Sequence, residues 1–154
     1  MRKTLLCGLV LAGALFGGAP AAQASDASIR EVVITHGQRQ VAEDKRFIKA
    51  MRNLSTRKGL IKAKAAAGRQ GASVTMWRNA LASETADTAP VASGREKMLD
   101  ALDLYNKGIR RLQKAIRQAL NSGGNSGVAK AKQALKNMRT ASKRVGQAAE
   151  LLVG

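Results

Sequence analysis

Two stretches near the C-terminus, residues 94–121 and 126–153, have the clearest hydrophobic periodicity in the chain. In each, apolar side chains recur every three or four residues, which is the one-sided stripe of an amphipathic helix. The stripes consist of Met98, Leu102, Tyr105, Ile109, Leu112, Ile116 and Leu120, and of Val128, Ala131, Leu135, Met138, Ser142, Val145, Ala149 and Leu152. Residues 121–125 contain two adjacent glycines, which are typical of a turn. The pattern therefore predicts a long antiparallel helical hairpin.

The first part of the preceding segment, residues 25–54, has a looser helical pattern. Ser28 and Glu31 have the spacing of a capping box near its start. Residues 32–35 are β-branched throughout and Gly37 follows them, which weakens the helix prediction. A short strand or a bent helix at 32–35 therefore remains open as an alternative.

Two breaks are expected further along. Polar residues and a glycine at 55–59 precede a lysine- and alanine-rich helix at 60–67, and the glycines of 68–71 end that helix. Another helix is expected to start near Ser73. The fold class is therefore all-α, with two or three shorter helices from 25–85 packed along the hairpin.

A linker is predicted at residues 85–93. This stretch contains Pro90 and lacks any hydrophobic period. Ser93 is the expected N-cap of the long helix, with Glu96 as its partner three residues on. The linker separates the short helices from the hairpin within one domain, residues 25–154.

Two glycines, Gly108 and Gly146, lie in the interior of the expected hairpin. Each costs about 1 kcal/mol relative to alanine in a helix interior. Close approach of another helix is one compensation, but the sequence alone does not show it.

The first 24 residues have the organisation of a cleavable export signal. A positively charged start precedes an apolar run at 5–16, and residues 22–24 have the small-x-small pattern that signal peptidase accepts. We therefore expect cleavage before Ser25 and a secreted or periplasmic protein. The single cysteine, Cys7, lies in the leader, so the mature chain has no thiol or disulfide chemistry.

The mature chain is strongly basic. The full sequence has 27 lysines and arginines against 10 acidic residues, and removal of Arg2 and Lys3 leaves 25 against 10, a net charge of +15. Such a charge attracts polyanions. Only 3% of the chain is aromatic, which disfavours binding through stacked bases and favours contact with phosphates.

Two rows of cations are the candidate anion-binding residues. The first row contains Lys107, Arg110, Arg111, Lys114 and Arg117, and it lies opposite the apolar stripe. The second contains Lys132, Lys136, Arg139 and Lys143, beside the last stripe. The alternative is that both are solvated faces, since bases near a helix end complement its dipole and alkyl stems can cover a helix seam.

No catalytic or metal-binding constellation is evident. His36 is the only histidine, and a general base or a metal site needs partners that this sequence does not supply. Glu43 and Asp44 are adjacent and so do not face one another on a helix. The glycine-containing segments lack the spacing of a phosphate loop. We therefore expect no enzymatic activity, no cofactor and no metal.

The sequence thus predicts an exported, non-enzymatic helical binding protein whose partner is an anionic polymer or surface, such as nucleic acid or a phosphate-bearing envelope polymer. One alternative is an envelope protein-interaction module, adaptor or chaperone-like, with an apolar groove between helices. Another is a cationic membrane-surface protein, which needs a wide apolar face left unburied. No small-molecule substrate is evident, and the sequence leaves the oligomeric state open.

Overall fold

The structure is a computed structural model that describes residues 22–122 and 125–154. It contains α1 (Ala22–Ala50), α2 (Arg57–Ser83), α3 (Ala89–Ser122) and α4 (Asn125–Val153). These residues include no strand, so the all-α prediction is confirmed and 32–35 is helical. Residues 1–21 of the expected leader and residues 123–124 of the expected turn lie outside the described residues.

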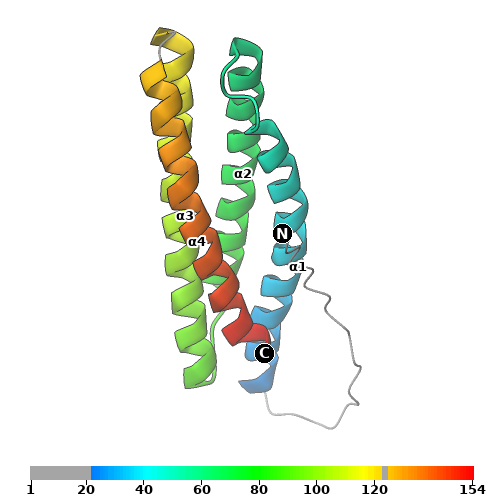
Figure 1. Ribbon diagram of the computed structural model, residues 1–154. Coiled ribbons are helices and arrows are strands. Elements are labelled where there is room, and N and C mark those ends of the chain that lie inside the picture. Colours follow the sequence, from blue (N-terminus) through cyan, green and yellow to red (C-terminus); the bar gives the residue numbers. More distant parts are fainter. Residues whose placement is uncertain (1–21, 123–124) are drawn as a thin grey trace, which may run out of the picture.

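The four helices lie side by side as a bundle (Figure 1). α3 packs most extensively on α4, and α2 lies between α1 and α3. α1 and α4 contact one another less than these pairs do, and they meet where the C-terminal end of α4 reaches the first half of α1. There Arg30 Nε donates a hydrogen bond of 3.2 Å to the carbonyl oxygen of Leu152. The bundle is therefore closed between α1 and α4 at one end.

Small residues recur every seven positions along both helices of the α3–α4 interface. All of them are buried: Gly94, Ala101, Gly108 and Ala115 on α3, and Gly127, Ala134, Ala141 and Ala148 on α4. A Cβ atom added to Gly94 would lie 2.7 Å from Leu152 Cδ2, and one added to Gly108 would lie 2.6 Å from Met138 Cγ. Leu152 and Met138 of α4 thus fill the spaces above Gly94 and Gly108 of α3, which permits a close approach.

The apolar stripe expected on α3 is buried, with Leu120 half-buried at its end. The prediction of the buried stripe on α4 was partly wrong. Ser142 is exposed and Leu135 and Ala149 are only half-buried, whereas Ala134, Ala141 and Ala148 face the interior. The reason is that α4 packs mainly on α3, where close approach requires alanine rather than larger side chains.

The break expected at 68–71 was wrong, because α2 is one helix of 27 residues. It is therefore nearly as long as α4, which has 29 residues. The N-terminal segment contains two helices, which agrees with the expected two or three, but at 29 and 27 residues they are not short. The two glycines at 68 and 71 cost roughly 2 kcal/mol together relative to alanine. Burial of Val74 and Trp77 on the same helix offsets this cost, since each fully buried apolar side chain contributes about 1.5–3 kcal/mol.

The expected linker 85–93 was too long. α3 begins at Ala89, so the connection comprises residues 84–88 and Ser93 lies inside the helix instead of capping it. Pro90 lies in the first helical turn, where its missing N–H would have had no partner. The amide of Ala92 bonds the carbonyl oxygen of Thr88 at 2.9 Å, which places the cap at Thr88.

The connection before α3 is held by a residue far away in the sequence. The Asp26 carboxylate of α1 accepts hydrogen bonds from the Asp87 amide (3.0 Å) and from the Thr88 hydroxyl (2.6 Å). These bonds, above all the one from Thr88, lower the pKa of Asp26. The capping box expected at Ser28 was wrong, because Ser28 lies inside α1 and its hydroxyl donates to the Ser25 carbonyl oxygen.

Candidate anion-binding surfaces

The basic side chains of this protein are mostly not neutralised by neighbouring carboxylates. Among residues 25–122 and 127–154, two ion pairs form: Arg46–Glu43 at 2.7 Å and Arg78–Asp103 at 3.0 Å. Both include exposed side chains, and such pairs contribute little to stability. The positive charge expected from composition is therefore displayed to solvent.

The predicted row on α3 is exposed along its whole length: Lys107, Arg110, Arg111, Lys114 and Arg117. Two of its members, Lys107 and Arg110, reach a groove of about 850 Å³ between α3 and α4, which we call the α3–α4 groove. Arg144 of α4 lines the same groove, and so do Asp100 and Asp103. This part of the row therefore lies in a surface of mixed charge.

The predicted row on α4 is also exposed: Lys132, Lys136, Arg139 and Lys143. Arg139 lines a groove of about 560 Å³ between α1 and α4, together with Arg52 of the connection between α1 and α2. The rest of this α1–α4 groove is largely apolar, with Ile48, Met51 and Leu135 among its lining. The structure thus distributes the nine predicted residues over separate surfaces and does not bring them together in one site.

A third groove, of about 480 Å³, was missed by the sequence reasoning. We call it the α1–α2 basic groove, and its basic lining residues are Arg46, Lys49, Lys58, Lys62 and Arg69. The spacing 58, 62, 65, 69 places its α2 side on one helical face. The expected breaks at 55–59 and 68–71 contained Lys58 and Arg69, which separated both from Lys62 and hid this signal.

A buried polar network joins α1, α2 and α3 beneath these surfaces. Gln70 is fully buried, and its Nε2 donates to Asp44 Oδ1 and, at 3.0 Å, to the Tyr105 hydroxyl. Asp44 Oδ1 also accepts from Gln40 Nε2 (2.9 Å) and from the Tyr105 hydroxyl (3.3 Å). Burial, and next the charge of Asp44, raises the pKa of the Tyr105 hydroxyl well above its ordinary value. Such networks fix how helices are aligned with one another.

The single histidine packs against the single tryptophan. The His36 and Trp77 rings are stacked, with centroids 6.5 Å apart and planes 11° from parallel. Burial, and next the charge of Arg39, lowers the pKa of His36. The described part of the chain contains no group of three or more His, Cys, Asp or Glu side chains placed to hold a metal ion. His36 therefore belongs to the packing between α1 and α2.

None of the helices in the described ranges has the length and apolar character needed to cross a membrane.

Comparison with models of known protein families, with curated proteins and with solved structures finds no match.

Proposed function

We propose that this chain is an exported, non-enzymatic helical protein that binds an anionic polymer through exposed basic side chains. The observation that supports the proposal best is the scarcity of ion pairs: two within residues 25–122 and 127–154, which contain all basic side chains of the sequence except Arg2 and Lys3. Uncompensated charge repels itself and attracts polyanions. Mass analysis of the exported protein should find Ser25 as its first residue.

The same proposal assigns α3 and α4 the role of an antiparallel hairpin that presents the two predicted rows. The contacts of the small residues support it: Gly94 faces Leu152 and Gly108 faces Met138, so 14 residues forward on α3 correspond to 14 residues backward on α4. A closely packed pair of helices holds its outer side chains at fixed spacing. A phosphate backbone needs such spacing for several contacts at once.

The salt dependence of binding tests the proposal. Each phosphate contact contributes about −0.9 to the slope of log affinity against log salt on duplex DNA. The variant Arg110→Gln, Arg111→Gln, Lys114→Gln and Arg117→Gln should reduce the magnitude of this slope by roughly 2 to 4. All four side chains are exposed and form no ion pair, and glutamine is a good helix former, so the fold should persist.

Circular dichroism and urea unfolding of the variant control for the fold. An unchanged slope in a folded variant would remove the α3 row from the binding surface. Failure of the wild-type protein to bind duplex DNA or a phosphate-bearing wall polymer at low salt would refute polyanion binding itself.

The α1–α4 groove favours a second candidate function, the binding of a partner protein. Val41 and Ile48 on α1 are 56% and 57% exposed, and Ile48 lines the groove opposite Leu135 and Met138 of α4. Arg52 and Arg139 lie in its lining, which suits an acidic amphipathic helix whose apolar face enters the groove. Such a partner would bind through burial of apolar surface. Its affinity would therefore fall less with rising salt than the affinity for a polyanion.

The occupant of the groove can be identified by photocrosslinking from position 48. The expected product is a single segment of an envelope protein with acidic residues on one helical face and apolar residues on the other. A matched crosslinker at Ile61, which is exposed outside this groove, should give no such product. Equal yields from both positions would contradict a specific docking site.

A membrane-surface role has less support. The exposed large apolar residues of the described chain are spread over all four helices: Val41, Ile48, Ile61, Met76, Leu104 and Leu151. Interfacial helices bind membranes through one continuous apolar face.

A further inference from the structure

The α1–α2 basic groove differs from the other grooves because no acidic side chain lines it. Arg46, Lys49, Lys58, Lys62 and Arg69 line it, and its lining contains no carboxylate. By contrast, the α3–α4 groove includes Asp100 and Asp103, the α1–α4 groove includes Asp44, and a groove beside His36 includes Glu43. Five cations therefore converge here from two helices with no acidic residue among them.

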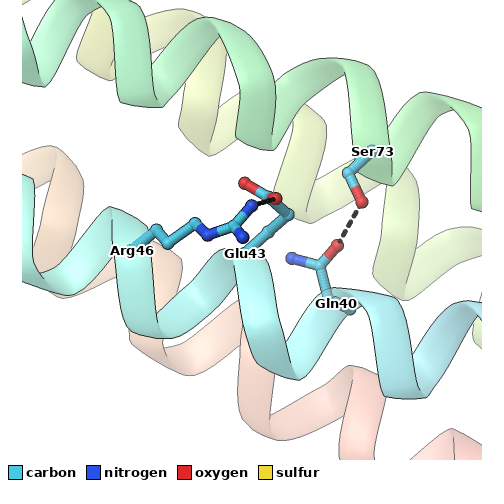
Figure 2. Close-up of polar contacts among 4 residues, drawn as sticks. All are labelled: Gln40, Glu43, Arg46 and Ser73. Carbon is cyan, nitrogen blue, oxygen red and sulfur yellow. Dashed lines mark hydrogen bonds and ion pairs between the residues drawn. The ribbon is translucent and has the colours of Figure 1, made fainter.

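The fold does not require this concentration of positive charge. Lys58 is the second residue of α2, whose first turn contains no acidic residue, and the positive end of the helix dipole disfavours a cation there. Lys58 and Lys62 are like charges four residues apart on one face, which also opposes helix formation. Arg46 alone of the five has an ion-pair partner, Glu43 on the same helix (Figure 2). A bound anion would offset the repulsion between Lys58 and Lys62 and the unfavourable interaction of Lys58 with the helix dipole.

α1 and α2, which form the walls of the groove, are held together at both of its ends. At the start of α2, a Cβ atom on Gly59 would lie 1.6 Å from the Asn53 carbonyl oxygen, so the helix packs directly on the α1–α2 connection. Further along, the Ser73 hydroxyl of α2 donates a 3.0 Å hydrogen bond to Gln40 Oε1 of α1 (Figure 2). The cations on the two walls are therefore kept at a fixed separation, and little ordering of the backbone is left to oppose binding.

Two neutral side chains in the lining can donate hydrogen bonds to an anion. Asn53 Oδ1 accepts from the Ser55 hydroxyl at 3.2 Å, which leaves its amide NH₂ available as a donor. Thr56 Oγ1 accepts from the Gly59 amide at 3.0 Å, which leaves its hydroxyl hydrogen available. Lysine, arginine, amide and hydroxyl donors together are the groups that proteins use to contact phosphate oxygens.

We infer that the α1–α2 basic groove is a binding site for phosphate groups of a phosphodiester polymer. The inference rests on the proposed polyanion binding and assigns it a site on α1 and α2 that the predicted rows on α3 and α4 do not include. Lys49, Lys58, Lys62 and Arg69 bind the phosphate oxygens, and Asn53 and Thr56 add hydrogen bonds. Because no aromatic residue lines the groove, the polymer is recognised by its backbone.

The test compares two variants of equal charge. The groove variant is Lys49→Gln, Lys58→Gln, Lys62→Gln and Arg69→Gln. The scattered variant is Lys45→Gln, Lys64→Gln, Lys97→Gln and Lys130→Gln, which removes four exposed cations from four different helices outside the groove. Binding is measured across a salt series with duplex DNA and with poly(glycerol phosphate), a phosphodiester polymer without bases.

The groove variant should reduce the magnitude of the salt slope by roughly 2 to 4, and the scattered variant should change it by less than about 1. In the wild-type protein, bound polymer should protect Lys49, Lys58 and Lys62 from acetylation, read by mass spectrometry, more than it protects Lys45 and Lys64. This labelling needs no variant to fold. An effect with both polymers identifies the shared phosphodiester, and an effect with DNA alone identifies nucleic acid.

Equal slopes in the two variants, or equal labelling of all these lysines with and without polymer, would overturn the assignment of the groove. If the wild-type protein still binds in that case, polyanion binding stands and this site does not. If the wild-type protein binds neither polymer, the proposed function itself fails.

Discussion

The two halves of this bundle are specified in different ways. Along α3 and α4, the small residues at every seventh position are buried, Leu152 and Met138 pack against two of them, and the apolar stripe on α3 is buried as its spacing predicts. Along α1 and α2, the contacts include a polar network and a stacked histidine and tryptophan, and several large apolar side chains remain exposed. The strong hydrophobic periodicity of α3 and α4 thus accompanies an apolar interface between them. The weaker periodicity of α1 and α2 accompanies an interface that depends on a few contacts between residues distant in the sequence.

The largest predicted effect is the difference in stability loss between a buried residue of α3 and an exposed residue of α1. Leu112 is 0% exposed, so Leu112→Ala should lower the free energy of unfolding by about 2–5 kcal/mol through lost burial and a residual cavity. Ile48 is 57% exposed, so Ile48→Ala should change it by less than about 1 kcal/mol. Urea denaturation followed by circular dichroism measures both. Similar losses would mean that the α1–α4 groove is closed in solution.

A smaller effect should distinguish Gly108 of α3 from Gly146 of α4. A Cβ atom at Gly108 would lie 2.6 Å from Met138 Cγ, whereas one at Gly146 has nothing within 4 Å. Overpacking costs about 1–3 kcal/mol, which exceeds or cancels the helix-propensity gain of about 1 kcal/mol. Gly108→Ala should therefore destabilise the protein or leave it unchanged, and Gly146→Ala should stabilise it by about 1 kcal/mol.

Thermal and urea unfolding of both glycine variants provide the measurement. Equal stabilisation by the two substitutions would show that α3 and α4 do not approach closely at Gly108.

The smallest effect concerns the polar network and appears at alkaline pH. The folded state raises the pKa of Tyr105 above its ordinary value of 10.0, so above that pH the unfolded chain loses this proton while the folded chain keeps it. Its contribution to stability is therefore complete below pH 10.0 and declines as the pH rises further, by at most about 1.4 kcal/mol per pH unit.

The variant Tyr105→Phe should lose this part of the pH dependence. The measurement is the difference in unfolding free energy between the wild-type protein and the variant at several pH values from 9 to 11, which cancels the titration of lysines common to both. A difference that does not change across this range would place Tyr105 outside the buried network.

The sequence by itself determined the features that depend on neighbours three, four or seven residues away. These include the helical class, the buried stripe of α3 and the exposure of the predicted rows of cations. It also showed that Gly108 and Gly146 lie inside helices, where glycine is unfavourable. Only the folded chain shows that Gly108 faces Met138 and that Gly146 faces open space.

Only the tertiary structure decided the features that join residues distant in the chain. α2 continues through Gly68 and Gly71 because it is buried against α1 and α3, and the start of α3 is fixed by Asp26, 61 positions before the amide that it binds. The α1–α2 basic groove exists because two helices place Lys49 beside Lys58 and Lys62. Local spacing sets which face of a helix is polar, but packing free energy selects which faces meet, and that selection requires the folded chain.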